Sequence, residues 1–295
     1  MRQTVFFLWL IGLVSLEVQA QEQLQYDLVA GQSFKIEQLA IQKITQTIDG
    51  SESTAINTVA GTFSMTVDQV LEDRYIILSS FESIQFKTES EVYGVLNDIN
   101  TDRIDSLSGT ESKIFRGLLN VPFTIILLKS GKIEAVENSI AMVENMITEA
   151  GIVDENLKTR IRESMEVNFG DASLAASIEQ MTFLFPRQKV SIGDTWSNQY
   201  NGQLNADNTW QLESYNLNEF VVTGTAKVVM TTREADTLSM SLSGFQSTTA
   251  IVDAASGLFK EITVNQEVDG FSSGMDMDYD EIPTKIEAII TFKRI

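Results

Sequence analysis

The sequence predicts an α+β protein that is mainly antiparallel β. We expect a long curved sheet or partly open barrel, with three short helices from the middle of the chain packed against it. Residues 21–136 and 186–295 carry apolar residues at every second position, as strands with one buried face do, whereas residues 137–184 change to helical spacing. The chain holds 3 prolines and no low-complexity linker, so residues 21–295 are predicted to form one domain.

The first strand zone contains several alternating runs. The clearest is the set Val59, Gly61, Phe63, Met65 and Val67. Residues 34–48 and 75–86 are two further β-rich runs. A phase slip near Leu39 in the first predicts a bulge, and Ser79 and Ser80 interrupt the second.

The rest of this zone contains a hairpin and a polar segment. Residues 123–128 and 133–136 are predicted to pair as a hairpin, with Gly131 supplying the positive φ of a tight turn. Residues 97–114 are polar and are predicted to form a loop or a short helix.

The middle zone is predicted to form helices over residues 139–150, 155–168 and 172–182. Each carries an apolar stripe on one face, formed by Ile140, Val143 and Ile147, by Leu157, Ile161 and Met165, and by Leu174, Ile178 and Met181. Gly151 and Gly170 are placed to end helices in a left-handed conformation. Asp154 and Asp171 are placed to cap the helices that follow.

The second strand zone returns to alternation. Residues 220–230 form one predicted strand and residues 238–252 the next. Residues 253–257 form a turn into a strand over 258–268, and residues 286–292 form the last strand.

Residues 1–20 have the pattern of a cleaved export signal. Arg2 precedes an apolar run over 5–14, and Val18 and Ala20 are the small residues before a cleavage site. We therefore expect residues 21–295 to be exported, to the periplasm or outside the cell. No later run approaches the roughly 18 apolar residues of a membrane helix, so no transmembrane segment is expected after signal cleavage.

Composition argues against most catalytic chemistry. The chain has 0 His and 0 Cys, which excludes triads, thiolate nucleophiles and imidazole or thiolate metal sites. The formal net charge of −20 repels nucleic acid, so no nucleic-acid partner is expected. No catalytic, cofactor-binding or metal-binding residue is assigned, no cofactor is expected, and we predict that the protein is not an enzyme.

Two motifs suggest chemistry but lack its context. Ser272 lies in a G-x-S-x-G pattern at 270–274, which would need a strand before it, a helix after it and a base nearby. We predict a glycine-rich loop between strands instead. A carboxylate pair for glycoside hydrolysis stays open by residue type, but nothing in the sequence singles out a pair.

The acidic run from Asp276 to Glu281 has two interpretations. Asp276, Asp278 and Asp280 lie two residues apart, like the start of a calcium loop, but Glu281 stands where such a loop needs glycine. A solvated strand face and a weak calcium site both remain open.

The most distinctive stretch runs from Pro186 through Val190, Gly193 and Asp194 to Trp196. It is predicted to begin the second sheet zone with one large anchoring aromatic. This Pro–Val–x–x–Gly–Asp–[Ser/Thr]–Trp element resembles one found in an uncharacterised family of exported bacterial β-rich proteins. Residues 118–136 and 252–257 are similar to that family too. The resemblance implies location and fold but no catalytic residue. Many of the family's members are lipid-anchored at a Cys that this chain lacks.

The favoured hypothesis is a non-catalytic exported protein that carries or binds an apolar ligand such as a lipid. Methionines on the predicted helices would suit an adaptable apolar surface; they are Met142, Met146, Met165 and Met181. Such a carrier should hold a cavity above about 300 Å³ between helices and sheet. The sequence names no ligand-binding residue and no oligomeric state.

The alternative is a structural or interaction module of the bacterial cell envelope, whose partner would be an envelope protein. It should have a filled interior and an exposed apolar patch. An outer-membrane barrel fits poorly with the helical centre and the Lys293-Arg294-Ile295 end.

Overall fold

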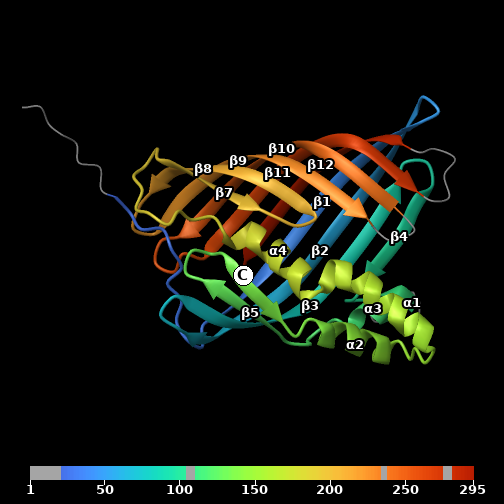
Figure 1. The fold of residues 1–295 in the computed structure, drawn as a ribbon, viewed down its shortest axis with the longest axis horizontal. Helices are drawn as coiled ribbons and strands as arrows, with labels where there is room; N and C mark the ends of the chain where they lie inside the picture. The colour runs from blue at the N-terminus through green and yellow to red at the C-terminus, as the bar shows by residue number, and fades with distance from the viewer. Residues whose placement is uncertain (1–20, 104–109, 234–237, 275–280) are drawn as a thin grey trace, which may run out of the picture.

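The computed structural model describes residues 21–103, 110–233, 238–274 and 281–295, and Figure 1 shows their arrangement. They form one 12-stranded antiparallel sheet in the order β6-β5-β3-β2-β1-β12-β11-β10-β9-β8-β7, with β4 paired to β3. The strands are β1 (Ser33–Ile48), β2 (Ser51–Val70), β3 (Arg74–Ser90), β4 (Gly94–Asn100), β5 (Phe123–Leu128), β6 (Ile133–Glu137), β7 (Thr195–Tyr200), β8 (Leu204–Tyr215), β9 (Glu219–Arg233), β10 (Leu238–Asp253), β11 (Phe259–Gly274) and β12 (Ile282–Arg294). The predicted fold class is confirmed, and the sheet is open rather than closed into a barrel.

The three central helices are confirmed as α2 (Ile140–Glu149), α3 (Glu155–Phe169) and α4 (Asp171–Thr182). Asp154 caps α3 as expected, because its carboxylate accepts the Leu157 N–H at 2.8 Å. Gly151 has the expected positive φ of 67°. A short helix, α1 (Thr110–Arg116), begins in the polar segment 97–114 and ends two residues beyond it.

The predicted helix end at Gly170 and the predicted helix cap at Asp171 are wrong. Gly170 is extended, at φ −68° and ψ 158°, and is itself the N-cap of α4. Asp171 is the first helical residue, and its carboxylate accepts the Ser139 N–H at 2.9 Å instead of capping its own helix. This bond joins α4 to the start of α2, a long-range contact that local spacing does not reveal.

Two strand predictions also need correction. β1 pairs with β2 and with β12 in unbroken register, so there is no bulge at Leu39, whose side chain lies on the exposed face. Register shifts occur in other strand pairs, for example between β2 and β3 at Thr62/Phe63 and Val67/Gln69. Residues 97–100, predicted as loop or helix, belong to β4, because polar Asn97 and Asp98 can extend an edge pairing with β3.

The sheet has an inner face turned toward the helices and an outer face turned away from them. Inner side chains from both strand zones join one apolar core with Leu174, Ile178 and Met181 of α4. In Figure 1 the strands β8 to β12 arch over one side, and the helices gather below them. The two zones meet where β1 pairs with β12, so the first and last strands lie side by side at the centre of the sheet.

Helix α4 and residues 183–185 fill the gap between the two edge strands. On one side the Glu179 carboxylate accepts the Ile133 N–H of β6 at 3.1 Å. On the other side the Trp196 Nε1–H of β7 donates to the Leu184 carbonyl at 2.9 Å, and the Asn198 side-chain amide donates to the Phe183 carbonyl. We call this junction of β6, α4 and β7 the seam. Among the described residues, none of the helices has the length and apolar character needed to cross a membrane.

Candidate functional site

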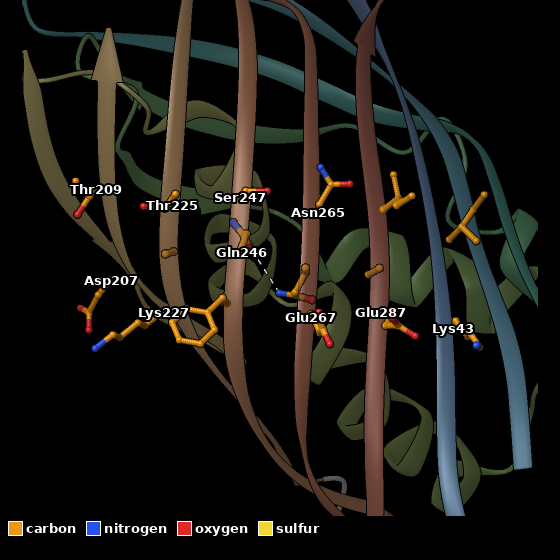
Figure 2. A pocket seen from close by; sticks show the side chains of 16 residues that line it. Lys43, Asp207, Thr209, Thr225, Lys227, Gln246, Ser247, Asn265, Glu267 and Glu287 are labelled. Carbon is orange, nitrogen blue, oxygen red and sulfur yellow. Dashed lines mark hydrogen bonds between the residues drawn. The ribbon is translucent and has the colours of Figure 1, made fainter. Parts of the chain in front are cut away.

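The largest hollow described on this protein is a trough of about 1,200 Å³ across the outer face of the sheet. Figure 2 shows its side chains, which come from strands β1, β12, β11, β10, β9 and β8. Its volume lies above the range of about 300–1,000 Å³ typical of small-molecule pockets. The trough is open to solvent along its length, so it would accommodate an elongated ligand more readily than a compact one.

Strand periodicity explains how the trough is lined. Side chains alternate between the two faces of a strand. Each strand therefore contributes two outward-facing residues to the trough, separated by one residue that points inward. On β10, for example, Phe245 and Ser247 face outward and flank the buried Gln246. The register aligns these outward residues into two parallel rows.

The two rows differ in character. The first, which we call the charged row, runs across the strands as Asp207, Lys227, Phe245, Glu267, Glu287 and Lys43. The second, which we call the neutral row, runs as Thr209, Thr225, Ser247, Asn265, Ile289 and Ile41. One wall of the trough is therefore ionic, and the other is polar but uncharged until it becomes apolar over β12 and β1.

Three apolar side chains of the trough are substantially exposed. Phe245 is 67% exposed, Ile289 is 55% and Ile41 is 45%. Ile289 and Ile41 are direct cross-strand neighbours, so their side chains form a continuous apolar surface. Covering these side chains with an apolar partner would release about 25 cal/mol for each Å² removed from water.

The acidic groups of the charged row already have partners. Lys285 Nζ lies 2.6 Å from Glu267 Oε1 and 3.5 Å from Glu287 Oε1. The hydrogen bond from Lys285 to Glu267 is the main reason that the pKa of Lys285 is raised above its usual value. Asp207 accepts a hydrogen bond from Gln199 Nε2 at 2.7 Å.

Beneath the trough, the inner face carries an unusual row of amides. Continuous register aligns Asn198, Asn208, Ala226, Gln246, Gln266, Ala288, Gln42 and Asn57. Gln266 Nε2 donates to Gln246 Oε1 at 3.3 Å, but the buried Nδ2 of Asn208 has no partner. This row adds polar groups to an inner surface that also carries buried hydroxyls, such as those of Thr248, Ser272 and Thr284.

The two hollows described between helices and sheet are small. One hollow there, walled by Ile36, Met65 and Ile178, measures about 20 Å³, and another, walled by Phe63, Phe86 and Phe169, measures about 70 Å³. Both fall below the 300 Å³ or so expected of a ligand cavity. Of the hollows described here, the two largest lie on the outer face, opposite to the face that the sequence suggested.

A second open hollow of about 800 Å³ continues the trough past β7 to the seam. It shares Asp207 and Thr209 with the trough and is bounded by Lys132, Phe185 and Pro186. The outer face is thus hollowed from β1 to the outer side of the seam.

The residues singled out in the sequence lie away from the trough. Ser272 lies within β11, is 2% exposed, and shares a hydrogen bond of 2.7 Å with Thr284 Oγ1. Residues 270–274, predicted as a glycine-rich loop, belong to β11, so Ser272 lies inside a strand and not at its end. Trp196 and Trp210 are both buried. Asp276, Asp278 and Asp280 lie outside the described residues.

The trough residues were missed because each looks ordinary in its own strand. The sequence does contain a partial signal. Ile41, Phe245 and Ile289 are apolar, but they occupy the alternate strand positions that face outward and that mostly carry polar residues. Their convergence depends on the register of six strands from both halves of the chain, which single-strand periodicity does not provide.

Comparison with solved structures shows a fold likeness to lipovitellin. A structure that concerns lipid–protein interactions in lipovitellin superposes with a TM-score of 0.51 at 12% identity. The match covers 91% of this chain and 25% of the lipovitellin chain, so this chain spans about a quarter of its length.

Two outer-membrane proteins match far more weakly. An outer membrane channel from Pseudomonas putida F1 has a TM-score of 0.26 at 7% identity, covering 92% of this chain and 97% of its own. Salmonella typhi OmpF in complex with daunomycin has a TM-score of 0.24 at 8% identity, covering 90% and 98%. Scores this low do not indicate a shared fold.

No curated protein matches this chain. Residues 72–259, more than half of the chain, match the family of unknown function DUF6263. That segment begins just before β3, includes α1 to α4 and ends at the first residue of β11. The expected relationship to an uncharacterised family is thereby confirmed, and the protein belongs to DUF6263.

Proposed function

We propose that this protein is a non-catalytic, exported binder of a lipid-like ligand, and that the ligand lies in the outer-face trough. The observation that carries this proposal is the trough itself, an open hollow of about 1,200 Å³ with exposed apolar side chains at its centre and along one wall. Its length suits a chain-like molecule, and its mixed walls suit one that is apolar over part of its length.

The energetics favour an apolar occupant. Fully burying a side chain such as Phe, Ile or Leu is worth about 1.5–3 kcal/mol relative to leaving it in water. Phe245, Ile289 and Ile41 are each about half exposed or more, so part of that free energy is available to a ligand. Hydroxyl and amide groups of the neutral row, such as Ser247 and Asn265, would fix the orientation of a polar end.

The other supports are indirect. The likeness to lipovitellin concerns fold alone at 12% identity, but the lipovitellin structure is one of lipid–protein interactions. The export signal predicted in residues 1–20 directs the proposal to the periplasm or the exterior, where lipids must be moved or held outside a bilayer. The absence of His and Cys from the sequence supports a non-catalytic role.

A second candidate is an interaction module of the cell envelope. The two small hollows between helices and sheet and the exposed apolar residues on the outer face favour it. In that case the same trough would receive a protein segment rather than a lipid.

The test compares two double variants on the same sheet face. Phe245→Ser with Ile289→Ser removes the apolar centre of the trough. Phe271→Ser with Val229→Ser removes two similarly exposed side chains, 48% and 46%, that do not line it. Each protein is exported from bacteria and purified without detergent, and its bound lipid is quantified by organic extraction and mass spectrometry.

We expect stoichiometric lipid on the wild type and on the Phe271/Val229 variant, and loss of most of it from the Phe245/Ile289 variant. Lipid that is equally abundant on all three proteins would place binding elsewhere. Wild-type protein that carries no lipid, and takes none from added vesicles, would reject the lipid proposal in favour of the interaction module.

A further inference from the structure

Most lysines in the strands are held in ion pairs. Lys35, Lys87, Lys260, Lys285 and Lys293 each have a carboxylate oxygen within 3.5 Å. The chain has 41 acidic and 21 basic residues, so carboxylates outnumber cations and a lysine on the sheet has many possible partners.

Lys43 and Lys227 are the exceptions. In the described part of the chain, neither ammonium lies within ion-pair distance of a carboxylate, although Lys43 is opposite Glu287 in the register and Lys227 is opposite Asp207. Those two carboxylates are directed elsewhere, to Lys285 and Gln199 respectively. Both unpaired lysines line the trough.

Their positions within the trough are related. Figure 2 shows Lys43 and Lys227 on opposite sides of Glu267 and Glu287. Four strand intervals separate β1 from β9, which at about 4.8 Å each is on the order of 19 Å along the sheet. One small anion cannot reach both ammonium groups, so each is a separate anchor.

Each anchor has an apolar neighbour. Lys43 is on the same face of β1 as Ile41, which continues into Ile289 of β12. Lys227 is directly opposite Phe245 in the register of β9 and β10. The charged row thus places a cation beside an exposed apolar side chain twice, on β1 and on β9.

We propose that the trough selects an amphipathic ligand with an anionic head, a carboxylate or a phosphate, which Lys43 or Lys227 binds while the hydrocarbon chain lies over Ile41, Ile289 and Phe245. This inference rests on the proposed lipid-binding function and specifies the ligand class. The overall charge of −20 repels anions at long range, so the two unpaired ammonium groups supply the local attraction that admits one here.

The test uses ligands that share one hydrocarbon chain and differ in the head. Oleate carries a carboxylate and oleyl alcohol a neutral hydroxyl, and inorganic phosphate supplies an anion with no chain. Binding is measured by calorimetry or by ligand-dependent thermal stabilisation at pH 8, at low and at high NaCl. The proteins are the wild type, Lys43→Gln with Lys227→Gln, and the control Lys35→Gln with Lys87→Gln. The control removes the same charge from paired lysines that do not line the trough.

We expect the wild type to bind oleate at least about tenfold more tightly than oleyl alcohol at low salt, and the preference to shrink in NaCl. The Lys43/Lys227 variant should bind the two ligands equally, and the Lys35/Lys87 variant should keep the preference. Equal binding of oleate and oleyl alcohol by the wild type would overturn the anionic-head inference and leave the lipid proposal standing. Phosphate binding as tight as that of oleate would overturn the amphipathic class. Failure of both oleyl ligands to bind would overturn the inference together with the proposed function.

Discussion

Glu179 is the acidic side chain at which α4 contacts the β6 edge of the sheet. Burial is the main reason that the pKa of its carboxyl is raised, partly offset by the Ile133 N–H that it accepts and by the charge of Lys132. Tyr26 and Tyr200 are buried nearby, and their own pKa values are raised by desolvation. Glu179 therefore holds α4 against β6 at the seam, although its surroundings disfavour its negative charge.

The first prediction concerns the pH dependence of stability at Glu179. The pKa of this carboxyl is higher in the folded protein than the value of about 4.3 in the unfolded chain. The stability that its protonated form contributes to folding is therefore fully present below the unfolded pKa. That contribution is lost as pH rises through the folded pKa. Glu179→Gln keeps a carbonyl to accept the Ile133 N–H and removes the buried charge. We expect it to gain stability relative to the wild type between pH 4 and pH 8, measured by urea unfolding across that range.

Glu163→Gln is the matched control, because Glu163 is an exposed residue of α3 and its loss changes net charge by the same amount. If the two variants show the same pH dependence relative to the wild type, Glu179 carries no charge penalty of its own.

At the scale of elements, the seam decides how an open sheet remains stable without closing. Edge strands present unpaired backbone groups, which proteins cover or otherwise protect. Here α4 covers β6, and residues 183–185 engage the side chains of β7. Gly131 shows how closely they fit, since a Cβ there would lie 1.9 Å from the Thr182 carbonyl oxygen.

The second prediction tests the β7 side of the seam. Trp196→Phe keeps an aromatic ring in the core but removes the Nε1–H that donates to the Leu184 carbonyl, leaving that buried oxygen without this partner. We expect a loss of about 1–3 kcal/mol in unfolding free energy and faster amide hydrogen exchange in α4.

Trp210→Phe is the comparison, because Trp210 Nε1 donates to Asn198 Oδ1 and reaches the segment after α4 only indirectly, through the Asn198 amide that donates to the Phe183 carbonyl. We expect it to accelerate exchange in α4 less than Trp196→Phe does. Exchange in α4 that is accelerated equally by both substitutions would show that the Trp196 bond has no special role at the seam.

At the scale of the whole molecule, the two strand zones are joined into one sheet through β1 and β12. Their pairing runs from Ile36–Arg294 to Gln46–Thr284. The trough crosses this junction, since Ile41 and Lys43 come from the first zone and the other lining residues from the second. The site consequently exists only when both halves of the chain are folded together.

The third prediction is that the strand zones unfold in one cooperative transition. Fluorescence of Trp196 and Trp210 reports on the second zone, and amide exchange of β2 and β3 reports on the first. We expect both probes to give the same urea midpoint. Ile286→Ala, at a buried position of β12, should lower both by the same amount, with a cost of about 2–5 kcal/mol. Separate midpoints would show that the halves are independent folding units.

Much of the fold could be predicted from periodicity, because the burial of one face imposes a two-residue repeat on strands and a longer repeat on helices. The stripes at Ile140, Leu157 and Leu174 predicted α2, α3 and α4 nearly to their ends, and Gly131 marked its hairpin. Predictions from local spacing were wrong where long-range contacts set the conformation, as at Leu39, Gly170 and Asp171.

None of the candidate site could be predicted in the same way. Phe245, Ile289 and Lys43 lie far apart in the chain, and each is unremarkable within its own strand. The amino-acid sequence by itself determined the fold class, the central helices, the charge and the membership in an uncharacterised family. Only the tertiary structure decided that the trough lies on the outer face and that Lys43 and Lys227, among the described lysines of the strands, lack a carboxylate partner. Both depend on strand order and register across the sheet, which long-range pairing sets and local alternation does not encode.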